Sequence, residues 1–125
     1  MDMTKVSEFQ QPFIACYSCL TEFDTELATA KYGIGAAGST TWERFCLNVP
    51  SSLVVVADNQ KASANYLAQQ GLITFLGEAQ DITTVTYQQE LIRLCKEWST
   101  ISLSKGYDVD GLGAKRVAET ILLLR

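Results

Sequence analysis

The segment Ser52 to Ala57, which reads SLVVVA, is the strongest structural signal in the sequence. A leucine is followed by three consecutive valines, and no charged residue interrupts them. A short, continuous run of β-branched residues is typical of a strand buried on both faces, as in the middle of a parallel sheet. This segment therefore predicts a sheet with helices packed on both sides.

The rest of the chain alternates between strand-like and helix-like patterns. We expect further strands at residues 13–20, 32–35 and 72–77, and helices at 21–30, 40–48, 59–70, 85–98 and 113–124. The side chains expected to face inward are Ala62, Tyr66 and Leu67 on the third of these helices, and Leu91, Leu94, Cys95 and Trp98 on the fourth. Gly71 follows the third helix where a left-handed C′ residue belongs. This order predicts an α/β fold, a Rossmann-like parallel sheet flanked by helices, in a single nucleotide-binding domain spanning residues 1–125.

A glycine-rich segment, GIGAAG at Gly33 to Gly38, matches the G-x-G-x-x-G fingerprint of dinucleotide-binding turns. Asp58 lies twenty positions after Gly38, where an acid that binds ribose would stand. However, Lys31 interrupts the strand before the turn, and only three residues of that strand are available. A second frame takes Gly35 to Ser39 as the loop and Thr40 as the helix start, so that backbone N–H groups form an anion site.

Glu43 has two interpretations. Thr40-x-x-Glu43 has the spacing of a capping box, in which Glu43 returns to the backbone N–H of Thr40. Alternatively, Glu43 accepts hydrogen bonds from the ribose hydroxyls of a nucleotide whose phosphates lie on the turn. Asn59 is equally open, as a helix cap or as a ligand residue, whereas Asp58 suits a turn at a strand end.

Three segments together resemble a known family. IGAAGSTTWERFCLNVPSSLVVVADNQ, YLAQQG and DVDGLGAKRVAETIL look like the C-terminal half of the UDP-sugar hydrolases of the pseudaminic-acid pathway. These are grouped with spore-coat polysaccharide biosynthesis proteins and are similar to the nucleotide-binding half of the peptidoglycan N-acetylglucosaminyltransferase. The resemblance covers Thr25 to Leu124. Residues 21–125 are family-like, and residues 1–20 match poorly.

The resemblance implies a glycosyltransferase-B-like domain, present here as a partial second domain. In the family, a UDP-linked 2,4-diacetamido-2,4,6-trideoxy sugar is hydrolysed with release of UDP, and a histidine of the first domain activates water. This chain contains no histidine, so it is expected to bind UDP weakly and not to be catalytic alone. The alternative is a stand-alone nucleotide-binding, NAD-type dinucleotide-binding or interaction domain. The implied UDP-binding residues are Gly38, Ser39 and Thr40 at the pyrophosphate, Glu43 at the ribose, and Asn59 and Gln60 at the phosphates and the anomeric centre, with Asn59 as the catalytic candidate.

Other chemistry is restricted by composition. Without histidine, serine–histidine and cysteine–histidine catalysis within this chain are excluded. Cys16 and Cys19 have C-x-x-C spacing, but a zinc site needs two more ligands, and we expect Cys16, Cys19, Cys46 and Cys95 to be buried and reduced. No metal or cofactor is expected. We expect Trp42 in the core or an interdomain face, and Arg44 and Lys61 as surface charges.

The net charge of −4 argues against nucleic acid as a partner. The start of the chain lacks a signal-peptide pattern, and the longest apolar run, Leu53 to Ala57, is too short to cross a membrane. A cytoplasmic protein that does not bind membranes is therefore expected. The apolar tail Leu122 to Leu124 predicts that the last helix meets a partner, either the family's first domain or a second copy.

Overall fold

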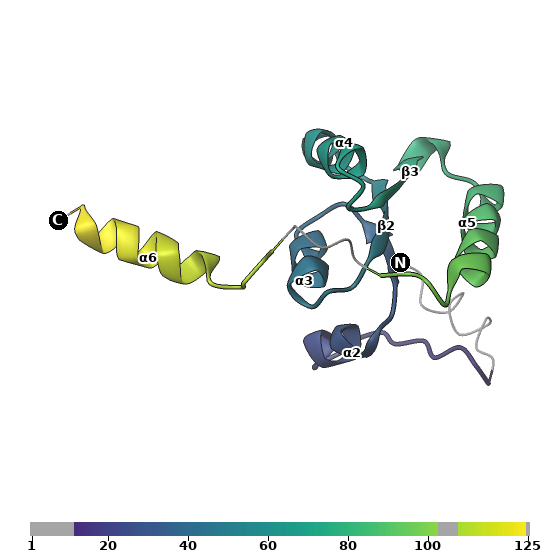
Figure 1. Ribbon diagram of the computed structural model, residues 1–125, viewed down its shortest axis with the longest axis horizontal. Helices are drawn as coiled ribbons and strands as arrows, with labels where there is room; N and C mark the ends of the chain where they lie inside the picture. Colours follow the sequence, from purple (N-terminus) through teal and green to yellow (C-terminus); the bar gives the residue numbers. More distant parts are fainter. Residues whose placement is uncertain (1–11, 103–107, 125) are drawn as a thin grey trace.

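The computed structural model describes residues 12–102 and 108–124. At its centre lies a parallel sheet of three strands, β1 (Gly33–Ala36), β2 (Ser51–Val55) and β3 (Thr74–Glu78), in the order β1-β2-β3 (Figure 1). Gly33 pairs with Ser51 and Ala36 with Val54, so alternate residues of the two strands share a face. All five residues of β2 are buried, as the valine run predicts for a central strand.

Along the described residues, one helix precedes the first strand, one follows each of the first two strands, and two follow the third. These helices are α2 (Phe23–Thr29), α3 (Thr40–Cys46), α4 (Lys61–Gln69), α5 (Thr84–Glu97) and α6 (Gly113–Leu123), with short 3₁₀ turns η1 (Asp58–Gln60) and η2 (Ala79–Asp81). The predicted α/β architecture, a parallel sheet flanked by helices, is confirmed. Gly71 has φ +70° directly after the last turn of α4, as expected for a C′ residue.

Different helices cover the two faces of the sheet. Leu53 and Val55 of β2 point toward α3 and α4, where they cluster with Ala37 and Ala64. Ser52 points to the other face and hydrogen-bonds to Glu90 of α5. Figure 1 shows α5 on one side of the strands and α3 and α4 on the other. A second apolar cluster joins Phe45, Leu67 and Leu72 below α3 and α4.

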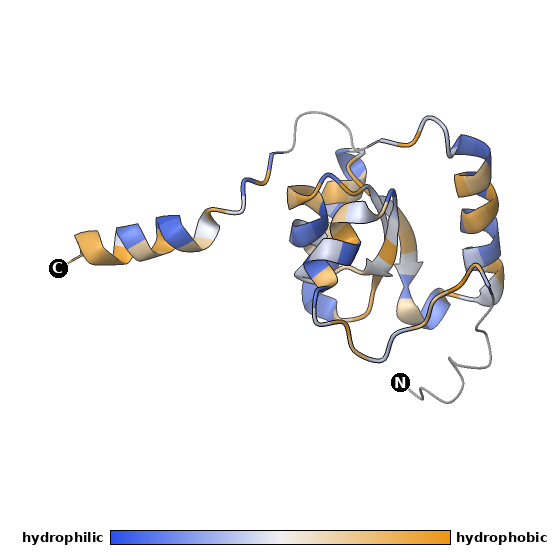
Figure 2. Ribbon diagram, turned by 90° about the horizontal axis from the view of Figure 1, so that it is seen from below, coloured by the Kyte–Doolittle hydropathy of each residue, from blue (hydrophilic) through white to orange (hydrophobic). Residues whose placement is uncertain are grey.

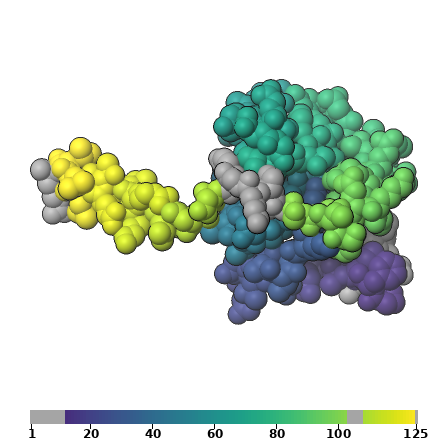
Figure 3. Space-filling view, viewed as in Figure 1, coloured from purple at the N-terminus to yellow at the C-terminus, as the bar shows by residue number. Residues whose placement is uncertain are grey.

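Helix α6 lies apart from this body. It extends away from the sheet in Figures 1 and 3, and each of its residues is exposed. Among the described helices, none combines the length and the apolar character that crossing a membrane requires.

The predicted strand at residues 13–20 is wrong. Ile14 forms one isolated bridge and the rest of the segment is irregular. Phe13 is 85% exposed and Tyr17 57% exposed. An apolar run makes a strand only where a neighbouring strand supplies backbone partners and a face to bury, and the sheet does not extend to this segment.

The inward faces of two helices also differ from expectation. On α4, Leu67 is buried as predicted, but Ala64 takes the second buried position, and Ala62 and Tyr66 are exposed. On α5, Leu94 is buried together with Glu90, whereas the predicted Leu91, Cys95 and Trp98 are exposed. Helix α5 therefore turns a mixed stripe toward the sheet, in which the ion-paired Glu90 is buried together with Leu94.

Candidate functional site

Two loops meet at the carboxyl edge of the sheet. The turn after β1 contains Gly38, and the turn after β2 leads into η1, which contains Asn59 and Gln60. A Cβ added to Gly38 would lie 3.6 Å from Nε2 of Gln60. The Gln60 side chain is held there because its Oε1 accepts a 3.0 Å hydrogen bond from the backbone N–H of Val56. The structure therefore brings Gly38 and Gln60 together, at the edge where α/β sheets bind ligands.

The first turn of α3 does not form a capping box. Ser39 is the N-cap residue and Thr40 is already helical, with no side-chain cap. The backbone N–H of Thr41 donates to the carbonyl of Gly38, and that of Trp42 to the carbonyl of Ser39, both at 3.0 Å. These two donors are thus used within the turn, and the amides of Ser39 and Thr40 are the candidates for a ligand. Glu43 is exposed on the outer side of α3, so the capping interpretation is wrong.

Charged groups surround the second loop. Lys61 Nζ lies 3.2 Å from Asp58 Oδ1 and 3.0 Å from Glu78 Oε2, so Lys61 is a paired residue that links η1 to the end of β3. The hydrogen bonds that Lys61 donates to Glu78 and, to a smaller extent, to Asp58 raise the pKa of Lys61. Asn59 is exposed and does not cap α4, whose N-cap is Gln60. Its side chain is therefore not committed to holding the start of that helix.

The first two glycines of GIGAAG have a structural role. Gly33 and Gly35 lie within β1, not in a turn, and both face the side chain of Arg44. A Cβ at Gly33 would lie 2.8 Å from Cδ of Arg44, and one at Gly35 would lie 3.1 Å from its Nη1. Side chains at these positions would displace the arginine. Glycine at these two positions leaves room for the Arg44 side chain beside β1, a packing role that differs from that of a dinucleotide fingerprint.

Arg44 is not the surface charge that we expected. It is only 6% exposed, and Nη2 donates a 3.2 Å hydrogen bond to the carbonyl of Ala36. Its buried Nε lacks a hydrogen-bond partner among the described residues. Burial lowers the pKa of Arg44, and the charge of Glu43 acts in the opposite direction. The guanidinium fixes α3 against β1 and holds the end of the strand from which the Gly38 loop starts.

Trp42 is 40% exposed, with its ring centroid 5.8 Å from that of Phe45. It lines an open cavity with residues 108–111, Gly113 and Arg116, next to the start of α6. Trp42 is therefore not a core residue, and it does not line the surroundings of Gly38 alone, because it also lines the cavity at the start of α6. Its exposure makes it a usable fluorescence reporter.

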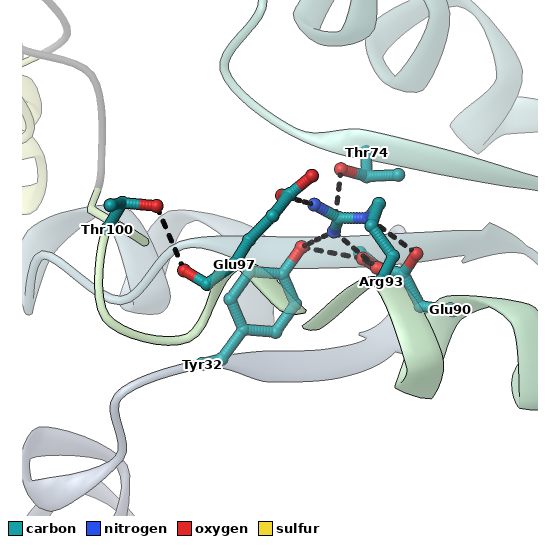
Figure 4. A network of polar contacts seen from close by, with 7 residues as sticks. Tyr32, Thr74, Glu90, Arg93, Glu97 and Thr100 are labelled. Atoms are coloured by element: carbon teal, nitrogen blue, oxygen red, sulfur yellow. Dashed lines mark hydrogen bonds and ion pairs between the residues drawn. The ribbon is translucent and has the colours of Figure 1, made fainter. Parts of the chain in front are cut away.

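A network of polar side chains occupies the opposite, amino edge of the sheet (Figure 4). Arg93 of α5 donates from Nε to Glu90 Oε2 at 2.9 Å and from Nη2 to Glu90 Oε1 at 2.6 Å. It also reaches Glu97 at 2.6 Å and the hydroxyl of Tyr32 at 3.1 Å. This network was not expected from the sequence, although Glu90–Arg93 and Arg93–Glu97 have the i, i+3 and i, i+4 spacings of helical ion pairs.

The network attaches α5 to the sheet. Glu90 is 5% exposed and accepts a hydrogen bond from Ser52, which is fully buried. Burial raises the pKa of Glu90, but the hydrogen bonds from Arg93 and Ser52 outweigh it, so that the pKa is lowered overall. A neighbouring cavity of about 260 Å³ is lined by Tyr32, Thr74, Arg93, Glu97 and Thr100, among others. Because Ser52 is inaccessible and Arg93 already donates to four groups, we interpret the network as structural.

The described residues contain neither a metal-binding cluster nor a disulfide. Within this part of the chain, no three cysteine or carboxylate side chains gather as metal ligands would. Cys19, Cys46 and Cys95 are exposed and Cys16 is half-buried, so the expectation that they are buried is wrong.

The fold and the site define a class of protein: a small α/β domain with a three-stranded parallel sheet and two converging loops at its carboxyl edge. No known protein family matches the sequence, and neither a curated protein nor a solved structure is significantly similar to it.

Proposed function

We propose that the chain is a UDP-binding domain that acts in hydrolysis of a UDP-linked 2,4-diacetamido-2,4,6-trideoxy sugar. The observation that carries the proposal is the meeting of Gly38 with the Gln60 side chain at the carboxyl edge of β1 and β2. Both residues belong to the blocks that carry the family resemblance. A phosphate needs a close approach to backbone N–H groups, and glycine permits that approach.

Each remaining residue has a role in this proposal. The amides of Ser39 and Thr40 and the Gln60 amide group bind the pyrophosphate, and Glu43, exposed on α3, accepts the ribose hydroxyls. Asn59, exposed and free of a capping role, faces the anomeric centre. Lys61 offsets one of the two carboxylates, Asp58 and Glu78, that would otherwise repel phosphate at this edge. Hydrolysis requires a histidine supplied by another domain, so this chain contributes nucleotide binding.

The dinucleotide alternative has weaker support. In that mode, the first glycines of the fingerprint form the turn that approaches the pyrophosphate. Here Gly33 and Gly35 lie inside β1, under Arg44. Only Gly38 remains in a position to approach a phosphate.

Isothermal titration with UDP, uridine and NAD tests the proposal. We expect UDP to bind with a dissociation constant on the order of 0.1–1 mM, a range suited to half of a cleft, and uridine and NAD to bind more weakly. Glu43→Ala and Asn59→Ala each weaken binding by about threefold or more, as loss of one hydrogen bond does.

Matched controls exist on the same chain. Glu119→Ala removes an exposed helical carboxylate from α6, and Asn65→Ala removes an exposed amide from α4; neither changes UDP affinity. Absence of heat with UDP, or tighter binding of NAD than of UDP, contradicts the proposal.

A further inference from the structure

Arg44 is a buried cation beside the strand that leads to the proposed nucleotide site. It is 6% exposed, although arginine is almost never buried unless it is paired. Figure 2 shows apolar residues of the sheet between the helices at the centre of the body, and Arg44 lies against Gly33 and Gly35 of this sheet. Among the described residues, no carboxylate forms a salt bridge with its guanidinium.

Stability alone does not explain the burial of this charge. A guanidinium that leaves water loses hydration, and one hydrogen bond to a carbonyl replaces only part of it. Accordingly, burial lowers the pKa of Arg44 more than the nearby charge of Glu43 raises it. An uncharged methionine of similar length would fill the same space at a smaller cost. The charge and the hydrogen-bonding group of Arg44 therefore indicate a role other than packing.

The hydrogen bond of Arg44 leads directly to the Gly38 loop. Its Nη2 donates at 3.2 Å to the carbonyl of Ala36, the last residue of β1. Gly38 follows two residues later, which places the guanidinium within about 13 Å of the Gly38 backbone. Over such a distance, one buried charge changes the affinity for an anion by up to about tenfold at low ionic strength. Arg44 can therefore act on a phosphate at the loop both through the backbone and through its charge.

We infer that Arg44 is a positioning residue for a diphosphate at the Gly38 loop, because it holds the end of β1 and supplies positive charge. The inference rests on the proposed function and specifies the ligand class of the same site. The affinity of the loop rises with the phosphate charge of the nucleotide, so UDP binds more tightly than UMP, and UMP more tightly than uridine. Loss of the arginine reduces these differences, while uridine binding stays the same.

NMR titration of the ¹⁵N-labelled chain with UDP, UMP and uridine tests this inference, since it measures weak binding directly. We expect Arg44→Met to weaken UDP binding by about tenfold in about 10 mM salt and by about twofold in about 150 mM salt, because salt screens the charge. Arg44→Lys keeps the charge and weakens UDP binding by at most about threefold. Uridine, which carries no phosphate, binds equally to all three chains.

Two further variants keep the test independent of the loss of the arginine. Gly35→Ala places a Cβ 3.1 Å from Nη1 of Arg44. It shifts the guanidinium without removing a charge, and we expect it to weaken UDP binding by about threefold, as the loss of one hydrogen bond does. Lys96→Met is the matched control, because it removes an exposed cation from α5 and leaves UDP binding unchanged. Dispersed amide spectra show that each variant is folded.

The outcomes separate this inference from the proposed function. A folded Arg44→Met chain that binds UDP as tightly as the unmodified chain overturns the inference. An equal loss of UDP and uridine binding also overturns it, because that result indicates general damage to the fold. In both cases the unmodified chain still binds UDP, and the proposed function stands. An unmodified chain that does not bind UDP overturns the proposed function itself, and the inference with it.

Discussion

At the residue scale, the position of Arg44 accounts for the first two glycines of GIGAAG better than a dinucleotide-binding turn does. GIGAAG has the letters of a dinucleotide turn, but two of its glycines make room for a guanidinium that crosses β1. The sequence offers no signal for this, because an arginine in a short helix is usually exposed and its contact with β1 is tertiary. Gly38 is the glycine whose environment fits the predicted role, beside Gln60.

Replacement of Gly33 by alanine tests the packing of Arg44. The added Cβ would lie 2.8 Å from Cδ of Arg44, so the arginine must move, and we expect a loss of about 1–3 kcal/mol in the free energy of unfolding. Denaturant unfolding measures it. Gly38→Ala is the control, because its Cβ would meet its nearest atom at an ordinary 3.6 Å. In an Arg44→Ala background, Gly33→Ala should cost much less; an equal cost in both backgrounds contradicts the account.

Glu90 gives the protein a specific acid sensitivity. Its pKa is lowered in the folded chain because, despite burial, Arg93 and Ser52 stabilise the carboxylate. The resulting stabilisation is complete above the unfolded pKa of about 4.3 and is lost as pH falls through the lower folded value. We expect Glu90→Gln to reduce stability at pH 7 by about 2–3 kcal/mol.

The same substitution should flatten the loss of stability between about pH 5 and pH 3. Thermal unfolding across this range measures the effect. Glu119→Gln, an exposed carboxylate on α6, keeps the pH dependence of the unmodified chain. If Glu90→Gln keeps it as well, Glu90 is not the group responsible.

At the element scale, the sequence predicts the existence of helices and strands better than it predicts which side of each helix is buried. The valine run of β2 and the alternation of strands and helices were sufficient for the sheet, because these signals are local. The orientation of α5 was not predictable from its leucines, since Glu90 and Arg93 take the inner face through bonds to Ser52 and Tyr32, which are distant in sequence. The strand expected at 13–20 failed because burial depends on neighbours that a local pattern does not reveal.

The end of α4 is an element boundary that the sequence did specify. Gly71 has φ +70° with open space around its missing side chain, so a substitution there costs backbone strain and not packing. We expect Gly71→Ala to lower the free energy of unfolding by about 1 kcal/mol, and Gly71→Asn to cost less, because asparagine tolerates this conformation better. Denaturant unfolding compares the two; equal costs would show that backbone conformation is not what glycine provides here.

At the scale of the whole molecule, the two edges of the sheet carry different kinds of polar residues. The amino edge holds a saturated ion-pair network that attaches α5, and the carboxyl edge holds two loops with exposed polar residues. A sequence motif could indicate the carboxyl edge, because the residues of each loop at that edge are close together in the chain. It could not show that Gly38 faces Gln60, a contact between loops that follow different strands.

An amide-resolved NMR titration of the ¹⁵N-labelled chain with UDP shows directly whether the nucleotide binds at the carboxyl edge of the sheet. We expect UDP to shift the amide signals of Gly38 to Thr41 and of Asn59 and Gln60, and to leave in place those of Thr74 and Thr100, which lie beside the cavity at the amino edge. Unchanged signals of the carboxyl-edge loops at saturating UDP, or changes that gather around Thr74 and Thr100, would show that UDP does not bind at this edge.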